Sequence, residues 1–322
     1  MDALSELLRA IRLSGAAFID AELSAPWSVQ TPPPDDIAAR LAQGAGRIIP
    51  YHLVSHGACW IEMKGDEPLH VGAGEVVMFP HGDVHVLSSA RGLEPMRITT
   101  EAVVRLTRPD SIANVQYGGA GEGTRIVCGF FACDEALSGH LVARLPRRLH
   151  VPAAADGVAG ALARGVHSLR ESARPGAGAV IGKLSELLFV DAVRSYIESL
   201  PALDGWLAGL KDRHLGRGLA LIFAKPDSDW TLETLADEVG ISRTALADRF
   251  VRCTGMAPMQ FLAQWRMRRA ADTLAQTDRA IKAVAESAGF QSTEAFSRSF
   301  KRQFGRPPAE WRRERRHVRA PE

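Results

Sequence analysis

The fold is decided by the stretch L-A-D-E-V-G-I-S-R-T-A-L-A-D-R-F, residues 235–250, because its pattern returns as V-A-E-S-A-G-F-Q-S-T-E-A-F-S-R-S-F, residues 284–300. Each copy combines two short amphipathic helices with a glycine-containing turn, which is the pattern of a helix-turn-helix unit. A single match could arise by chance in a small helical bundle, whereas a repeat at fixed spacing argues against chance. We therefore predict two helix-turn-helix units, at about residues 231–253 and 280–304.

The recurring residues have the chemistry that such units need. Ala236 and Gly240 return 49 residues later as Ala285 and Gly289. A small alanine lets the two helices of a unit cross closely, and glycine suits the left-handed conformation that ends the first helix. Helix-capping and buried positions recur in the same way: Ser242 and Ser292, Leu246 and Phe296, Phe250 and Phe300.

The segment between the two units predicts one uninterrupted helix. Pro258 suits a first helical turn, and residues 259–275 contain no glycine or proline. A helix of about 18 residues is roughly 27 Å long. A helix of that length could hold the second helix of each unit about one DNA turn apart, near 34 Å.

The charge is divided between the two ends of the chain. Residues 206–322 carry 21 Lys and Arg against 14 Asp and Glu, whereas residues 1–205 carry 18 against 23. The overall charge of +2 conceals this division. A basic C-terminal part containing helix-turn-helix units is typical of a domain that contacts DNA phosphates.

Residues 230–313 resemble the DNA-binding domain of the AraC/XylS family of bacterial transcription regulators. The resemblance is closest in G-F-Q-S-T-E-A-F-S-R-S-F-K-R-Q-F-G-R-P-P-A-E-W-R, residues 289–312. It implies sequence-specific binding to double-stranded DNA, with Lys301 and Arg302 nearer the phosphate backbone. The DNA-binding residues implied are Ser242, Arg243, Thr244, Ala247, Asp248, Gln291, Thr293, Glu294, Arg298, Lys301 and Arg302.

Two of these residues are acidic, which is unfavourable for phosphate contact. Asp248 and Glu294 could instead accept a hydrogen bond from cytosine N4 and so specify a base. Equally, either could belong to a solvated helix face without a role in DNA reading.

The first half of the chain has a different pattern, with short apolar or alternating runs separated by Gly, Pro and Asp. This pattern predicts β-strands joined by turns. The run G-A-G-E-V-V-M-F-P-H-G-D-V-H, residues 72–85, resembles the second motif of the cupin β-barrels. Gly46, followed after five residues by His52, is similar to the start of the first cupin motif. Together with the C-terminal part, this predicts the cupin-sensor branch of the AraC-type regulators.

The cupin resemblance implies a ligand site whose metal-binding set is incomplete. The four ligand positions of a metal-binding cupin fall on His52, Val54, Ala58 and His85, so that two ligands are missing. An effector pocket lined by His52, Val54, His56 and His85 is the favoured reading. A divalent metal such as zinc, held by His52 and His85 with His56, His81 or Cys59, is the alternative. His56 should share the strand face of His52, about 13 Å along it, so a shared metal would need a bulge.

The cysteines predict neither a disulfide framework nor a zinc finger, because the four are not closely paired. Cys128 and Cys133 lie five residues apart in one predicted strand, so their side chains should point to opposite faces. This is poor geometry for a disulfide, although a redox-sensing thiol pair is the alternative.

A strongly apolar helix is predicted for residues 184–200, ahead of Pro201. Such a face indicates either a homodimer seam or packing against the chain's own barrel. No run approaches 18 apolar residues and the N-terminus lacks the order of a secretory signal, so we expect no membrane partner and a cytoplasmic protein.

The predicted fold is therefore α+β and multidomain. It comprises a cupin-like, ligand-sensing β-barrel with an N-terminal helix at residues 1–152, a helical linker with a dimerisation role at 153–205, and an all-α tandem helix-turn-helix domain at 206–322. The predicted function is a transcription regulator, not an enzyme, whose barrel senses a small-molecule effector. Both an activator that contacts RNA polymerase and a repressor fit the sequence. The alternative is a metal-dependent cupin enzyme with an appended DNA-binding domain.

Overall fold

The computed structural model describes residues 2–11, 13–41, 47–107, 112–133, 135–152, 157–171, 176–200 and 205–317. Gly46, the first residue of the predicted first cupin motif, lies outside them. The contacts divide the chain into two units. The barrel unit comprises residues 13–133 and 145–196, and the helical unit comprises residues 1–12, 134–144 and 197–322.

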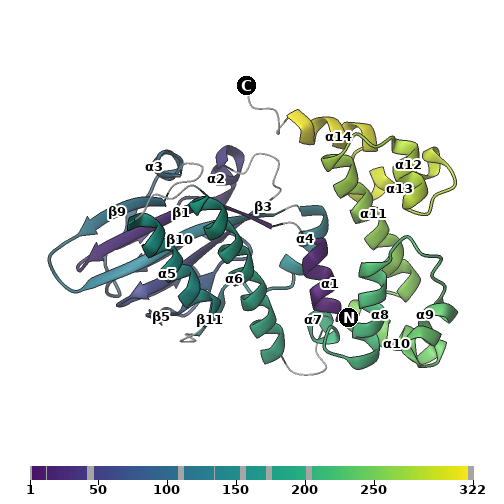
Figure 1. The fold of residues 1–322 in the computed structure, drawn as a ribbon, viewed down its shortest axis with the longest axis horizontal. Coiled ribbons are helices and arrows are strands. Elements are labelled where there is room, and N and C mark those ends of the chain that lie inside the picture. Colours follow the sequence, from purple (N-terminus) through teal and green to yellow (C-terminus); the bar gives the residue numbers. More distant parts are fainter. Residues whose placement is uncertain are drawn as a thin grey trace. The chain divides into compact units, whose positions relative to one another are not determined.

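The barrel unit is built from two sheets (Figure 1). In the described part of the chain, the six-stranded sheet has the order β11 (Leu149–Val151), β6 (Val76–Met78), β3 (Arg47–His56), β10 (Gly123–Cys133), β1 (Leu13–Ser24) and β9 (Ile112–Gly118). The five-stranded sheet has the order β5 (Leu69–Gly72), β4 (Ala58–Met63), β7 (His85–Ser88), β2 (Ser28–Gln30) and β8 (Met96–Arg97).

The core of this unit lies between the two sheets. β4 alternates half-buried and buried residues, as expected of a strand with one face toward a core. Its buried residues Cys59, Ile61 and Met63 join one apolar cluster with Val54 and Ile126 of the six-stranded sheet. The predicted cupin-like barrel is thus confirmed as two facing sheets rather than one closed sheet.

Two helices cover the outer face of the six-stranded sheet: α5 (Val158–Glu171) and α6 (Ala177–Ser199) (Figure 1). On α6, the Ser185 hydroxyl shares a 3.0 Å hydrogen bond with Tyr51 of β3. Phe189 packs against Phe131 of β10 with ring centroids 5.5 Å apart. Much of the apolar face predicted at residues 184–200 is therefore used for packing on the chain's own sheet, which is the alternative to a dimer seam.

Two short helices, α2 (Pro34–Leu41) and α3 (Thr100–Leu106), pack beside the strands β3 and β10. Ile37 of α2 shares a cluster with Ile48 and Phe130, and Val103 of α3 packs against it. These helices contribute side chains to the cavity between the sheets.

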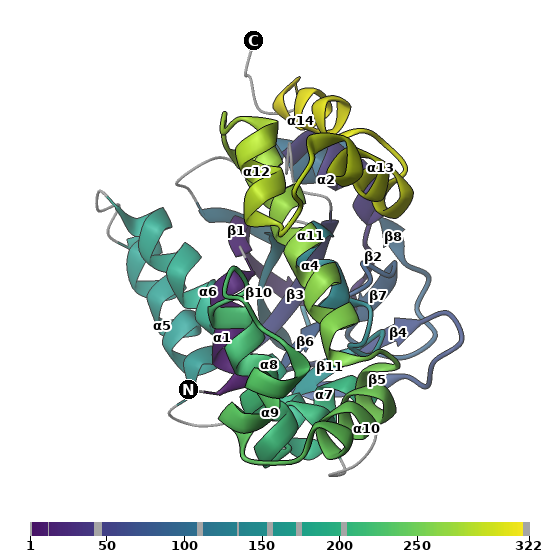
Figure 2. The ribbon, with the colours of Figure 1, turned by 90° about the vertical axis from the view of Figure 1, so that its right-hand side faces the viewer.

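The helical unit contains, in its described part, α1 (Ala3–Ala10), α4 (Glu135–Val142), α7 (Gly205–Gly209), α8 (Arg213–Ala224), α9 (Leu232–Val239), α10 (Arg243–Thr254), α11 (Pro258–Gln276), α12 (Ile281–Ser287), α13 (Thr293–Phe304) and α14 (Pro308–His317). α11 is the single helix predicted between the repeats. Figures 1 and 2 show α9 and α10 near one end of α11, and α12 and α13 near the other.

Both predicted helix-turn-helix units are confirmed. Gly240 and Gly289 have φ angles of 76° and 85°, in the left-handed region where glycine is favoured. Ser242 caps α10 by accepting from the amide of Ala245, and Ser292 caps α13 in the same way. The recurring alanines and the paired apolar residues are buried: Ala236, Ala285, Leu246, Phe250, Phe296 and Phe300.

The contacts assign α1 and α4 to the helical unit, which differs from the predicted boundary at residue 152. α1 packs on α8, and α4 packs on α11. Leu7 of α1 and Leu141 of α4 are fully buried. Their apolar faces are too short to be seen in sequence as belonging to a domain more than a hundred residues away.

Among the helices that the structure describes, none has the length and apolar character needed to cross a membrane.

Candidate functional site

The exposed faces of α10 and α13 carry the residues expected to contact DNA. Arg243, Thr244 and Asp248 are exposed on α10, and Glu294 and Arg298 are exposed on α13. Ser242, Gln291, Lys301 and Arg302 are also exposed, whereas Ala247 and Thr293 are partly buried. The structure therefore places all eleven predicted residues on or next to these two helices.

The charged residues of these faces make no ion pair within the described part of the chain. This holds for Arg243 and Asp248 on α10 and for Glu294 and Arg298 on α13. Other arginines nearby are used internally: Arg266 donates to the carbonyls of Pro226 and Ser228. The four predicted base-reading side chains are instead exposed to solvent.

The helix that joins the two units has a length suited to duplex DNA. α11 contains 19 residues, which corresponds to about 28 Å. It is fixed by packing toward both ends, since Phe250 of α10 meets Phe261 edge to face and Trp311 of α14 donates to the carbonyl of Ala271. Two successive major-groove segments are about 34 Å apart, so the separation is of the right order.

A second candidate site is a cavity of about 380 Å³ between the two sheets of the barrel unit. Its walls are mostly apolar, with Ile19, Ala21 and Leu23 from β1 and Ile126 from β10. α2 and α3 contribute Ile37, Val103 and Leu106. Polar side chains line the cavity at only a few positions, among them His52, Cys128, Thr31 and Arg97. Such a lining suits an apolar molecule with few polar groups.

One wall of this cavity carries a hydrogen-bonded row of side chains. Cys128 of β10 lies directly opposite His52 of β3 in the strand register, and its Sγ lies 3.1 Å from His52 Nδ1. His52 Nε2 lies 2.7 Å from Nε2 of His85 on the other sheet. His85 Nδ1 lies 2.7 Å from the carbonyl of Asp83.

The Asp83 carbonyl at the end of this row determines which ring nitrogens carry a proton. A carbonyl only accepts, so His85 Nδ1 carries a proton and donates it to Asp83. When both rings are neutral, His52 Nε2 then donates to His85 Nε2, and His52 Nδ1 accepts from the Cys128 thiol. Phe79 stacks on His85 at a centroid distance of 3.5 Å and fixes the ring.

Burial keeps every group in the row neutral. It lowers the pKa of His85 to about 4, and it lowers the pKa of His52 well below the usual 6.5, with a further contribution from the neighbouring His85. Burial also raises the pKa of the Cys128 thiol. Removing these groups from water disfavours each charged form.

The row does not fit the metal that cupins commonly hold. Two nitrogen ligands of a tetrahedral zinc lie roughly 3.3 Å apart when each Zn–N bond is about 2.0–2.1 Å, whereas the two Nε2 atoms here are 2.7 Å apart and share a proton. Val54 and Ala58 occupy the other two ligand positions. In the part of the chain that is described, no three His, Cys, Asp or Glu residues gather as a metal site would require.

The structure separates the other predicted barrel residues from His52 and His85. The prediction that His56 shares the strand face of His52 is wrong, because the pairing of β3 with β10 shifts by one residue between Val54 and His56. Such a bulge turns the following side chain to the other face. Val54 is buried in the core, and His81 pairs with the carbonyl of Leu145 at 2.9 Å.

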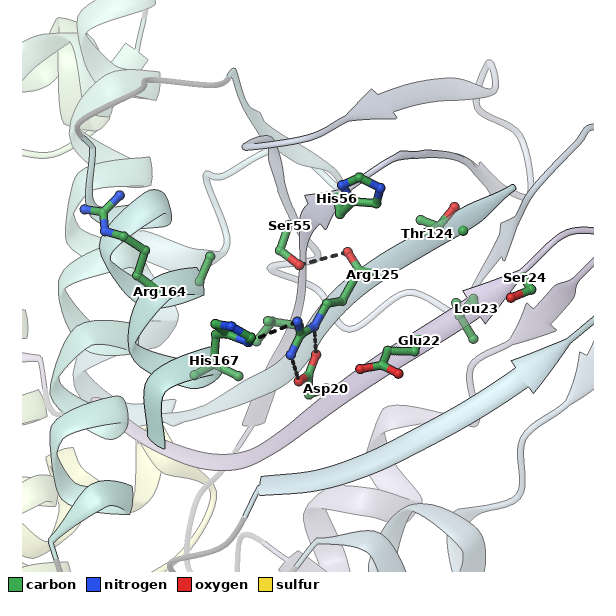
Figure 3. A pocket seen from close by; sticks show the side chains of 14 residues that line it. Asp20, Glu22, Leu23, Ser24, Ser55, His56, Thr124, Arg125, Arg164 and His167 are labelled. Atoms are coloured by element: carbon green, nitrogen blue, oxygen red, sulfur yellow. Dashed lines mark hydrogen bonds and ion pairs between the residues drawn. The ribbon is translucent and has the colours of Figure 1, made fainter. Parts of the chain in front are cut away.

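His56 instead lines a groove of about 530 Å³ on the outer face of the six-stranded sheet, where several charged and polar side chains gather (Figure 3). In this groove Arg125 forms two bonds to the buried Asp20 carboxylate, at 2.8 and 2.5 Å. It also donates to His167 Nδ1 of α5 at 3.1 Å. The arrangement ties β1, β10 and α5 together.

Sequence reasoning missed two features of the barrel unit. In the sequence, Cys128 stands out only as a member of a cysteine pair, because its position opposite His52 depends on strand register. The Asp20–Arg125 pair joins residues 105 positions apart, so no local pattern could reveal it. The two acidic residues Asp20 and Glu22, at alternating positions of β1, were the one available signal.

Comparison with known proteins supports the assignment of both domains. A family model described as a cupin matches residues 2–198, which is more than half of the chain. A model described as a helix-turn-helix domain matches residues 235–314. These matches cover the barrel strands, most of the first helix-turn-helix unit and all of the second.

Relatives match along nearly the whole chain. A putative AraC-like transcription regulator of Streptomyces lividans is 29% identical over 97% of this chain and 98% of its own length. The transcriptional regulator MtrA of Neisseria gonorrhoeae is 29% identical over 98% of this chain and 99% of its own. The transcriptional activator RclR of Escherichia coli K12 is 26% identical over 97% of both. The chain therefore belongs to the cupin family and is an AraC-type, DNA-binding transcription regulator with an N-terminal cupin domain, not an enzyme.

Proposed function

We propose that this regulator reads two successive major-groove segments of double-stranded DNA with α10 and α13. An apolar small molecule held between the sheets of the barrel sets its affinity for the operator. The observation that carries the DNA-reading part is that α10 and α13, near the two ends of α11, both leave their polar faces exposed. The proposed contacts are those of Arg243, Asp248, Glu294 and Arg298 with base edges, and of Lys301 and Arg302 with phosphates.

The test is binding of the full chain to a fluorescent fragment from the region upstream of its own gene, across a salt series. We expect binding that survives competitor DNA, with protection of two adjacent major grooves per protomer. Phosphate contacts should make the affinity fall steeply with salt. A scrambled fragment of the same length is the control, and equal affinity for both fragments would contradict sequence-specific reading.

The lining of the cavity determines the class of effector. Apolar side chains dominate it, and the buried histidines are neutral, so a multiply charged molecule would lose its hydration without compensation. We infer an effector with an apolar body and one hydrogen-bonding group. Its volume must fit a cavity of about 380 Å³. The saturated ketone 3-octanone meets these conditions and serves as a probe.

Ligand occupancy can reach the helical unit through two covalent connections. β1 and β10 line the cavity, and the residue that begins β1, Leu13, pairs with the residue that ends β10, Cys133. β1 follows α1, and β10 precedes α4, with one or two residues between. α1 and α4 pack on α8 and α11, which adjoin the first helix-turn-helix unit. A ligand that shifts these strands would therefore shift both supports of the DNA-reading helices.

This route is tested by weakening one support. Leu7→Ala removes a fully buried side chain between α1 and α8. We expect the operator affinity of this variant to lose its dependence on 3-octanone, while 3-octanone still stabilises the barrel unit against heat. Arg9→Ala on the exposed side of α1 is the matched control and should behave as wild type. By linkage, operator DNA must change the affinity for 3-octanone by the same factor as 3-octanone changes the affinity for DNA.

A homodimer is part of the proposal. On α6, Val180 and Leu187 are more than half exposed and lie seven residues apart on one face. Sedimentation of Leu187→Glu against wild type tests this, with the equally exposed Val251→Glu as control. If the protein activates transcription, RNA polymerase is a further partner. Because its proposed target is chromosomal DNA, we also place it in the cytoplasm.

A further inference from the structure

The side chains Cys128, His52 and His85 form a connected row from the cavity wall of one sheet to the opposite sheet. Cys128 and His52 both line the cavity, and His85 lies behind them on β7. A thiol hydrogen-bonded to a histidine whose other nitrogen is held by a third group is the arrangement that activates nucleophilic cysteines. Here the third group is His85, itself oriented by the Asp83 carbonyl.

We propose that Cys128 is a covalent attachment site for apolar α,β-unsaturated carbonyl compounds that enter the barrel cavity, with His52 and His85 acting as the proton relay. The inference rests on the proposed function, because it specifies the effector class of the same cavity. If the row had only a structural role, its hydrogen bonds would be sufficient. Cys128 also borders the cavity, so a ligand held there could reach its thiol.

The addition balances without any further reactant. The Cys128 Sγ forms a bond to the β-carbon of the unsaturated carbonyl while the carbon–carbon π bond breaks. The thiol proton passes to His52 Nδ1, and the proton on His52 Nε2 passes to His85 Nε2. Return of these protons along the same row delivers one proton to the α-carbon. The net reaction is addition of S–H across the double bond, with neither oxidation nor reduction.

The surroundings of the thiol determine which electrophiles can react. Burial disfavours a free thiolate in the empty cavity, so polar reagents in bulk water should find little reactive sulfur. An apolar electrophile that enters the cavity meets the thiol next to a base at 3.1 Å. Selectivity for apolar electrophiles is therefore expected from geometry and desolvation together.

The chain contains its own comparison thiols. Cys128 and Cys253 are both half-buried, but Cys253 belongs to α10 of the helical unit. Cys59 lies in the apolar core, where burial raises its pKa to about 12, and Cys133 is also buried. Neither Cys59 nor Cys253 has a histidine hydrogen-bond partner within the described residues. A reaction governed by exposure alone would modify Cys253 at least as fast as Cys128.

The experiment treats the full chain with 1-octen-3-one and, separately, with iodoacetamide, and maps the modified cysteines by peptide mass spectrometry over time. We expect 1-octen-3-one to modify Cys128 first, and iodoacetamide to modify Cys253 before Cys128. Cys128→Ser should lose the enone adduct, and His52→Phe should form it at least tenfold more slowly. Enone addition to Cys253 before Cys128, or an unchanged rate in His52→Phe, would overturn the inference.

The saturated ketone 3-octanone distinguishes the two levels of the proposal, since it cannot form an adduct. If 3-octanone raises the melting temperature of wild type and of His52→Phe, both are folded and both cavities bind ketones. In that case, absence of a Cys128 adduct overturns covalent attachment and leaves the apolar effector site standing. If 3-octanone produces no shift in wild type, the apolar effector site itself is wrong, and the attachment proposal is withdrawn with it.

Discussion

Arg249, on the second helix of the first helix-turn-helix unit, α10, donates to the carboxylate of Asp212 at 2.6 Å. The same carboxylate caps α8 by accepting from the amides of His214 and Leu215. One side chain therefore fixes the start of α8 and the orientation of α10. Because α1 also packs on α8, this contact belongs to the route that we propose for the effect of a bound ligand on α10.

Asp212→Ala should lower the free energy of unfolding of the helical unit by about 1–2 kcal/mol, because it removes both a helix cap and a half-exposed ion pair. Arg249→Ala, which keeps the cap, should lower it by less. Urea unfolding measures both. Arg217→Ala is the control, because its 4.0 Å pair with Glu238 is exposed on both sides. A control effect as large as that of Asp212→Ala would mean that general charge, not this contact, is responsible.

Arg298→Ala should weaken binding to the cognate fragment by about 1–3 kcal/mol, if the guanidinium makes a two-point contact to a guanine. Binding to random DNA should change little. Arg302→Ala is the comparison, because a phosphate contact should weaken both complexes similarly and reduce the salt dependence by about one unit of slope. Titration of both variants on both DNAs gives the answer. Equal losses for Arg298→Ala on the two DNAs would assign it to the backbone.

Asp248→Ala should relax sequence preference at one base pair, because an aspartate that accepts from cytosine N4 rejects other bases there. Its side chain is exposed and has no ion-pair partner in the described part of the chain. Selection of bound sequences from a random pool measures the preference. If the variant merely binds all DNA more tightly, Asp248 acts by electrostatic repulsion alone.

The stability of the barrel unit should fall with pH below about 6.5. The pKa values of His52 and His85 are lowered on folding, so the unfolded chain takes up protons before the folded one does. The loss should begin near the usual histidine pKa of 6.5 and continue to about pH 4, where folded His85 is protonated too. Each histidine contributes a slope of about 1.4 kcal/mol per pH unit within this window.

Urea unfolding at a series of pH values measures that slope. The double variant His52→Phe, His85→Phe should show a flatter profile between pH 6.5 and 4, because it lacks the two groups whose pKa values shift. The remaining histidines are present in both proteins and serve as the internal reference. The same acid slope in both proteins would contradict the assignment.

Asp20→Ala should lower the free energy of unfolding of the barrel unit by about 3 kcal/mol or more, because it leaves the Arg125 guanidinium without its buried counter-charge. Asp20 is fully buried and receives two bonds from Arg125. Glu22→Gln, on the same strand and in the same groove, removes a more exposed charge and should cost less than 1 kcal/mol. If both variants lost a comparable free energy of unfolding, the stability of the barrel unit would not depend specifically on the buried Asp20–Arg125 pair.

The repeat in the C-terminal part could be predicted almost completely, since each feature depends on neighbours in sequence. A serine cap needs an amide three residues ahead, as Ser242 and Ser292 have. Likewise, an i, i+4 apolar pair such as Phe296 and Phe300 defines a buried helix face. These local relations survive in any tertiary context.

The barrel could be predicted in class but not in detail. Alternating runs indicated strands, and the spacing of residues 72–85 placed His85 in the ligand region, where it does meet His52. The prediction for His56 was wrong because one bulge reverses the facing of every residue beyond it. Bulges depend on which strand pairs with which, and the sequence does not display that pairing.

The sequence by itself thus determined that this chain carries two helix-turn-helix units, joined by one helix, on the C-terminal side of a strand-rich, cupin-like half. Helix caps, turns and periodicities are set over a few residues, so the sequence states them directly. Only the tertiary structure decided that Cys128 stands beside His52, that Asp20 is buried against Arg125, and that α1 and α4 belong to the helical unit. Each of these brings together residues dozens to more than a hundred positions apart. Such contacts depend on burial, strand register and packing between distant segments, which are defined only in the folded chain.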